Sequence, residues 1–119
     1  MKNNRESLKK NNAMNFTDYR KDYLKITIDL RNVKTERAFL MKMQEIFQFP
    51  SYFWLNFNSL DDCMLSLDWI DERTIEIDFF HLEELKDTNN SLYIIVKESL
   101  TMYKDYWQKR EDKQVTFNF

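Results

Sequence analysis

The amino-acid sequence predicts an α/β fold in which a small, mostly parallel sheet of three strands is packed with three to four helices. Three segments alternate apolar and polar residues with a period of two, which is the pattern of a strand with one buried face. The segments between them repeat apolar residues at helical spacing. Strands separated by helices in this way are typical of parallel sheets. The 119 residues suffice for one domain with a single core and are too few for two.

The N-terminal part differs in composition from the rest of the chain. Residues 1–23 are mostly polar and charged, and we expect a mobile tail there, with some helix over residues 16–23. The folded domain is expected to span residues 24–119. It opens with a strand over residues 24–30, where every second residue is Leu or Ile.

Two helices are expected after this strand. Thr35 is placed to cap the first, whose apolar residues continue to Phe49 before Pro50 stops it. Residues 51–57 then form an aromatic loop. Residues 58–70 predict a second helix, because apolar residues recur there at helical spacing. Its apolar stripe comprises Leu60, Cys63, Met64, Leu67 and Ile70.

The C-terminal half supplies the remaining strands and helices. Residues 74–80 alternate again and predict the second strand. A short helical turn is expected over residues 81–85, and a polar break follows at residues 87–90. Residues 91–109 form the longest helical candidate, and residues 115–119 alternate as a closing strand.

Glycine is absent from the sequence. No phosphate-cradling glycine loop or dinucleotide-binding fingerprint is therefore possible, because those turns need a backbone that only glycine provides. Left-handed positions at turns and helix ends must fall to other residues, of which Asn is the most tolerant. We expect Asn32, Asn89 and Asn90 to take such positions.

The net charge of −2 conceals a strong asymmetry along the chain. Residues 1–50 carry 11 Lys and Arg against 6 Asp and Glu, whereas residues 51–90 carry 2 against 10. Residues 91–119 are nearly balanced, at 5 against 4. A polyanionic middle argues against nucleic acid as a direct ligand and favours a basic protein partner. An acidic face that is merely solvated is the alternative.

Residue types with reactive side chains are scarce. The only cysteine, Cys63, lies on an apolar stripe, so we expect a buried, unreactive thiol and no disulfide. His81 is the only histidine, and with Glu84 it supplies two metal ligands where a site needs more. The sequence therefore predicts no enzyme, no metal site and no cofactor. It contains neither an apolar signal segment nor an apolar run of about 18 residues, so we expect a cytoplasmic protein without a membrane partner.

Residues 49–70 contain a proline, an aromatic pair, an Asn, and then the run Leu-Asp-Asp-Cys with a Trp soon after. With the strand over residues 24–30, this segment resembles the barstar family of ribonuclease inhibitors. Family members have a proline, an aromatic pair and an Asn, and then a helix that runs Leu-x-Asp-Cys with a Trp soon after. The order of strands and helices also matches, so the resemblance covers residues 24–119. The matching residues are Pro50, Tyr52, Phe53, Asn56, Leu60, Asp62, Cys63 and Trp69.

The chain departs from the family pattern at three places. Trp54 follows the aromatic pair, where the family usually has glycine. Asn58 stands where barstar has an aspartate at the start of the helix, so the shape is kept and the charge is lost. The approach to Trp69 is about two residues longer than in the family.

Helical geometry supports the mechanism that the resemblance implies. A second stripe on the helix over residues 58–70 lies opposite the apolar one and should face solvent beside the aromatic loop. A ribonuclease binds an RNA phosphate with converging cationic side chains, and an outward carboxylate on a rigid helix can take that phosphate's place. Asp62 is that carboxylate, although an ordinary exposed helix residue is the alternative reading. The stripe comprises Asn58, Asp62, Leu65 and Trp69.

The resemblance implies an immunity or antidote protein that forms a 1:1 complex with a cognate basic ribonuclease or nuclease toxin. The loop and acidic helix of residues 52–69 would block the active site. Tyr52 would be an aromatic anchor, with Asn56 and Asn58 as polar contacts, while Phe53 is expected to be buried. Asp105 on the long helix is the closest match to a further acidic contact in the family.

One alternative function remains open. A barstar-like module could neutralise a different nuclease or a non-nuclease toxin, which the lost charge at Asn58 allows.

Overall fold

The computed structural model of the protein describes residues 16–18 and 22–119. Helices alternate with strands along the chain, in the order that the sequence predicts from residue 23 onward. The elements are β1 (Phe16–Asp18), β2 (Tyr23–Asp29), α2 (Glu36–Phe47), α3 (Phe57–Met64), β3 (Thr74–Phe80), α4 (Leu82–Thr88), α5 (Asn90–Gln108) and β4 (Gln114–Asn118).

The sheet has the strand order β1-β2-β3-β4. β2, β3 and β4 are parallel, as predicted, and their register places Ile26 beside Ile77 and Ile77 beside Phe117. Because side chains alternate along each strand, this register brings the apolar residues of all three strands to one face of the sheet. The predicted α/β fold is therefore confirmed.

The expectation of helix over residues 16–23 is wrong where the structure describes this segment. Phe16–Asp18 form β1, which pairs antiparallel with β2 and places Phe16 opposite Lys25. A three-residue strand is too short to show a period of two, and pairing with β2 defines it, so its own sequence pattern contains little trace of it. The rest of the expected mobile tail, residues 1–15 and 19–21, lies outside the described residues.

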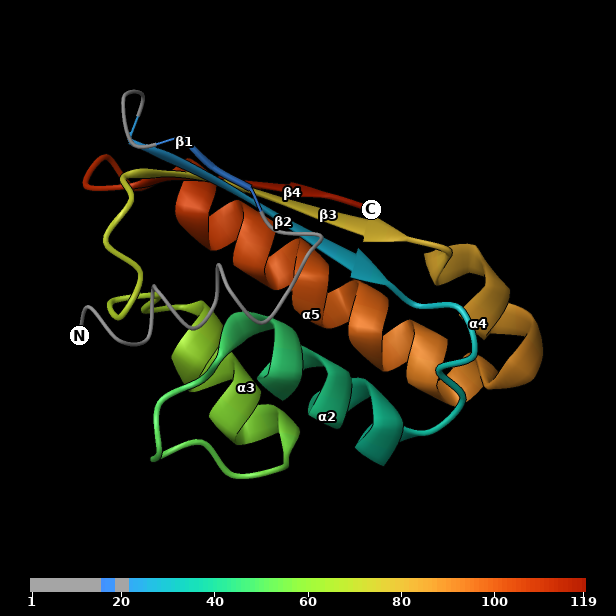
Figure 1. The fold of residues 1–119 in the computed structure, drawn as a ribbon. Coiled ribbons are helices and arrows are strands. Elements are labelled where there is room, and N and C mark those ends of the chain that lie inside the picture. The colour runs from blue at the N-terminus through green and yellow to red at the C-terminus, as the bar shows by residue number, and fades with distance from the viewer. Residues whose placement is uncertain (1–15, 19–21) are drawn as a thin grey trace.

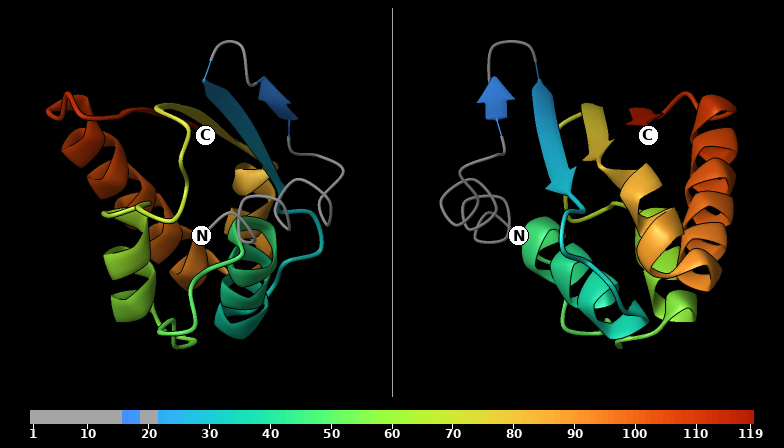
Figure 2. Two further views of the ribbon diagram at one scale, coloured as in Figure 1. Left: turned by 60° about the vertical axis from the view of Figure 1, so that its left-hand side comes forward. Right: turned by 90° about the vertical axis from the view of Figure 1, so that its right-hand side faces the viewer.

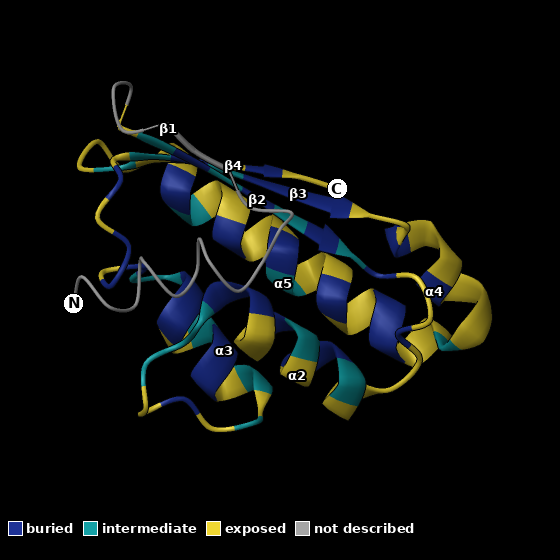
Figure 3. Cartoon of the chain, in the orientation of Figure 1, coloured by how far each residue is buried: buried dark blue, intermediate teal, exposed yellow. Residues whose placement is uncertain are grey.

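The described helices all lie on one side of the sheet and form a second layer (Figures 1 and 2). α5 lies directly beneath the sheet (Figure 1). α3 lies on the side of α5 that faces away from the sheet. The buried faces of the helices and of the sheet meet between the layers (Figure 3). The core is built from the inward residues of β2 and β3, from β4, and from one stripe of each helix.

The opposite face of the sheet is polar, and its side chains pair with one another. Asp78 accepts a hydrogen bond of 2.6 Å from Asn118 and lies 3.4 Å from the Lys25 ammonium. The Tyr23 hydroxyl donates to Glu76 at 2.6 Å. Part of the negative charge of residues 51–90 is thus neutralised locally on this face.

The first helix begins as predicted and the second ends earlier than predicted. The Thr35 hydroxyl accepts a hydrogen bond of 3.0 Å from Ala38 N and so caps α2. α3 ends at Met64, and Leu67 then adopts a left-handed backbone with φ of 49°. The chain therefore turns before Ile70, although all five residues of the predicted apolar stripe are buried.

Candidate functional site

The loop between α2 and α3 is tied to the first turn of α3. Asn56 is the N-cap of α3, and its side-chain oxygen accepts a hydrogen bond of 2.8 Å from Ser59 N. The Ser59 hydroxyl in turn accepts a hydrogen bond of 2.8 Å from Trp54 N. Asn56 N donates to the carbonyl of Trp54 at 2.7 Å, and Phe53 N donates to that of Pro50 at 3.0 Å. These bonds fix the loop and the helix start as one unit.

α3 presents a polar face to solvent, as predicted. Leu60, Cys63 and Met64 are fully buried on one side of the helix, whereas Asn58 and Asp62 are exposed on the other. Within the described residues, the Asp62 carboxylate takes part in no side-chain hydrogen bond or ion pair. Its charge is therefore available to a partner.

The neighbouring carboxylate has a structural role. Asp61 accepts a hydrogen bond of 2.6 Å from the hydroxyl of Tyr103, which lies fully buried on α5. Burial, and then this hydrogen bond, hold the pKa of Tyr103 above its usual range. A second tie comes from Trp107, whose Nε1 donates to the carbonyl of Met64 at 2.8 Å. The C-terminal half of α3 is thus tied to α5, at Asp61 and at Met64.

Leu65 and Trp69 are less exposed than the predicted solvent-facing stripe requires. Leu65 is the C-cap of α3 and is half-buried against the core. The prediction that Trp69 faces solvent is wrong, because its ring is only 4% exposed and its Nε1 donates to the carbonyl of Phe47 at 3.0 Å. The turn at Leu67 is the reason, since a helical stripe does not continue past the helix end.

The aromatic loop has one buried and two exposed rings. Phe53 is buried, as expected, with its ring centroid 4.5 Å from that of Phe49. Tyr52 is 51% exposed, and partial burial raises the pKa of its hydroxyl. Trp54 is 74% exposed, although no functional role was assigned to it from the sequence. The sequence did contain a signal for such a role, because Trp54 stands where the family usually has glycine.

Asp105 is exposed on α5, as a contact residue would be. It follows Tyr103 by two positions, which turns its side chain about 200° around the helix. Tyr103 points to α3, so Asp105 points away from it. No interaction among the described residues joins Asp105 to Asp62.

The Cys63 thiol is fully buried in the face of α3 that packs on the core. Burial raises its pKa to about 11, so the thiolate is almost absent at neutral pH. This agrees with the expected unreactive thiol.

His81 Nδ1 lies 2.6 Å from a carboxylate oxygen of Glu84. The described residues include no group of three or more side chains able to hold a metal ion. In the same part of the chain, no helix is long and apolar enough to cross a membrane.

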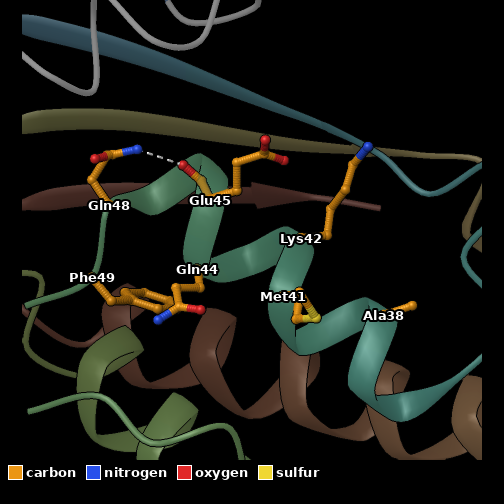
Figure 4. A pocket seen from close by; sticks show the side chains of 7 residues that line it. All are labelled: Ala38, Met41, Lys42, Gln44, Glu45, Gln48 and Phe49. Carbon is orange, nitrogen blue, oxygen red and sulfur yellow. Dashed lines mark hydrogen bonds between the residues drawn. The ribbon is translucent and has the colours of Figure 1, made fainter. Parts of the chain in front are cut away.

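A groove of about 710 Å³ runs along the outer side of α2 (Figure 4). Met41 and Phe49 contribute apolar surface to it, and Gln48 Nε2 donates to the carbonyl of Glu45 at 2.9 Å at its edge. It contains none of the predicted contact residues, which lie on α3, α5 and the loop. The groove meets the loop at Phe49, whose ring centroid lies 4.5 Å from that of Phe53 and 5.6 Å from that of Trp69.

The chain matches a known protein family. A family model described as "Barstar (barnase inhibitor)" matches residues 23–119. No curated protein sequence matches the chain significantly. The matched residues include the whole loop, α3 and α5.

Proposed function

The chain belongs to the barstar family, and from this we propose that it is an intracellular inhibitor that binds and blocks the active site of a cognate basic ribonuclease. It would act as the immunity or antidote protein to that enzyme, in a 1:1 complex in the cytoplasm. The observation that carries the proposal is the exposed carboxylate of Asp62, which has no partner among the described residues and lies on a helix capped by Asn56 and tied to α5.

The proposed mechanism is replacement of a substrate phosphate by a carboxylate. A ribonuclease binds its phosphate through cationic groups, and these form strong hydrogen bonds to any well-placed oxyanion. Asp62 needs little reorganisation to meet them, because α3 is capped by Asn56 and tied to α5 through Tyr103 and Trp107. Preorganisation of this kind lowers the entropic cost of association.

The remaining contacts surround Asp62. Tyr52 would lie flat against the enzyme, and Asn58 would donate from the first turn of α3. Asn56 uses its side-chain oxygen as a cap, which leaves its amide N–H groups for the partner. Leu65 would cover the apolar edge of the contact.

Two other predicted contact residues take different places in the proposal. Asp105 points away from α3, so it would contact only a partner that extends from α3 around to the far side of α5. Trp69, being buried, holds the C-terminal end of α2 through its hydrogen bond to the carbonyl of Phe47.

A second candidate function is supported by two departures from the family pattern. Trp54 is exposed in the loop where the family usually has glycine, and Asn58 lacks the family's charge. The same scaffold would then neutralise a different nuclease or a non-nuclease toxin. Either target would use the same face of α3.

The first experiment is a pull-down from the host with the tagged chain, the Asp62→Ala variant and an Asp87→Ala control. Asp87 is an exposed carboxylate on α4, so the control removes the same charge far from α3 (Figure 1). We expect wild type and control to recover a basic ribonuclease and silence it. Breaking a desolvated charge pair costs about 2–5 kcal/mol, so Asp62→Ala should raise Kd by about 30- to 5000-fold.

The barnase–barstar complex is the reference example of such an aspartate hot spot. Recovery of an unrelated protein equally by wild type and both variants would refute the mechanism. Recovery of a non-ribonuclease toxin that depends on Asp62 would support the second candidate function.

A further inference from the structure

Trp54 has the largest exposed fraction among the large hydrophobic side chains that the structure describes, at 74%. An indole ring in water forgoes the favourable burial that aromatic side chains provide. Tyr52, two residues earlier, is also exposed, so two aromatic rings lie on one short loop. Exposed aromatic residues that cluster in this way are typical of binding surfaces.

The backbone holds the Trp54 ring outside the core. Its N–H is bonded to the Ser59 hydroxyl, and its carbonyl accepts from Asn56 N. Phe53, immediately before it, is buried. The φ angle of Trp54 is not positive, so the loop accommodates a Cβ at this position without backbone strain. The ring is therefore a preorganised, outward side chain.

Trp54 and Asp62 extend from one rigid unit. Ser59, which bonds to Trp54 N, lies in the first turn of α3, and Asp62 lies on the next turn. A partner that binds Asp62 therefore contacts the unit that also carries Trp54. The unit offers one carboxylate and one large planar ring, as a nucleotide offers a phosphate and a base.

The surroundings disfavour two other occupants of this ring. Residues 51–90 carry 2 basic against 10 acidic residues, and an acidic segment is repelled by the anionic surface of a membrane. The same charge opposes a second copy of the chain docking with the same face. A basic enzyme with an apolar slot suits both features.

We propose that Trp54 occupies the base-binding subsite of the partner ribonuclease while Asp62 occupies its phosphate subsite. This inference rests on the proposed function. Enzymes that bind single-stranded RNA hold its bases by stacking them on aromatic or apolar side chains, and an indole has a similar planar face. Trp54 would thereby also determine which nucleases the protein inhibits.

The test compares Trp54→Ala, Trp54→Phe and Asp62→Ala for binding to the ribonuclease recovered above. We expect Trp54→Ala to raise Kd by about 10- to 100-fold and Trp54→Phe to raise it much less, because a ring is retained. Trp54 is exposed, so both variants should keep the wild-type melting temperature. A Trp54→Ala variant that binds as wild type does would overturn the inference.

Competition then locates the ring within the enzyme. Each ribonucleoside, which has a base but no phosphate, should weaken binding of wild type and leave that of Trp54→Ala unchanged. Inorganic phosphate, against chloride at equal ionic strength, should weaken binding of Trp54→Ala but not that of Asp62→Ala. Equal competition by nucleosides against wild type and Trp54→Ala would place Trp54 outside the base subsite. Loss of binding in Asp62→Ala alone would refute this inference and leave the proposed function standing, whereas unaltered binding in Asp62→Ala would refute the proposed function.

Discussion

Two consecutive aspartates on α3 have opposite roles because the helix turns them about 100° apart. Asp61 faces α5 and accepts the hydrogen bond of Tyr103, whereas Asp62 faces solvent. The sequence alone identified the exposed member correctly, because Cys63 and Leu60 defined the buried stripe. It did not identify the partner of Asp61, since a contact across 42 positions depends on how the helices pack.

This division of roles predicts different effects on stability. Tyr103→Phe removes the hydroxyl and keeps the ring, so it should lower the free energy of unfolding by about 1.5–3 kcal/mol, the range for a hydrogen bond to a charged group. Asp62→Asn should change it by less than about 0.5 kcal/mol, because the side chain is exposed and unpaired within the described residues. Urea unfolding of both variants measures the difference. Equal destabilisation by the two would show that Asp61 does not anchor α3.

The helices end without glycine, and this shapes their C-termini. Among the residues that the structure describes, five have positive φ: Asp22, Asn32, Gln48, Leu67 and His81. The prediction of a left-handed backbone is confirmed at Asn32 and is wrong at Asn89 and Asn90. Asn89 instead accepts a hydrogen bond of 3.1 Å from Leu92 N and caps α5, and Asn90 is the first residue of that helix. Composition showed that such positions must exist but not where each helix ends.

Gln48 offers a test of the cost of a left-handed helix end. It is the C-cap of α2 with φ of 52°, a conformation that disfavours most L-residues by about 1–2 kcal/mol. Gln48→Gly should raise the free energy of unfolding by about 0.5 kcal/mol once the greater chain entropy of glycine is included. A thermal melt should show a Tm higher by about 2–4 °C.

Asn32→Gly is the matched control for this variant. Asn tolerates the left-handed region, so its replacement should give a smaller gain. A gain at Asn32 as large as that at Gln48 would contradict the explanation.

The ends of helices and strands were predicted correctly where the local sequence pattern determines them. The predictions were wrong where tertiary packing determines where an element ends. β3 matches its predicted residues, 74–80, because a strict alternation sets both ends of the strand. The end of α3 was misplaced because residues 65–70 keep a helical apolar spacing although they turn into the core. The same error put Trp69 on the exposed stripe. β1 was missed because its three residues are defined by pairing with β2.

At the scale of the molecule, ion pairs neutralise some of the acidic residues of residues 51–90 and leave others unneutralised. Asp78 is paired with Lys25 on the sheet face, and Glu83 lies 3.9 Å from Lys86 and from Lys97 beside α4. Asp62 has no such cation within the described residues. The uncompensated charge therefore includes α3, where the proposed partner binds.

This distribution predicts that ionic strength controls how fast the complex forms. Salt screens exposed charges, with a Debye length of about 10 Å at 0.1 M and about 3 Å at 1 M. Raising NaCl from about 0.05 to 0.5 M should slow association with the recovered ribonuclease by about 10- to 100-fold. Dissociation should change far less, because contacts formed at the buried interface are screened weakly. Stopped-flow measurements give both rates, and the barnase–barstar pair is the reference case for such steering.

Two variants separate the long-range field from the contact itself. Asp87→Ala removes one charge far from α3, so it should reduce the association rate slightly and leave dissociation unchanged. Asp62→Ala removes the same charge at the proposed contact, so it should reduce association to a similar degree and accelerate dissociation strongly. Association that is independent of salt would contradict electrostatic steering, and equal dissociation rates for the two variants would place Asp62 outside the interface.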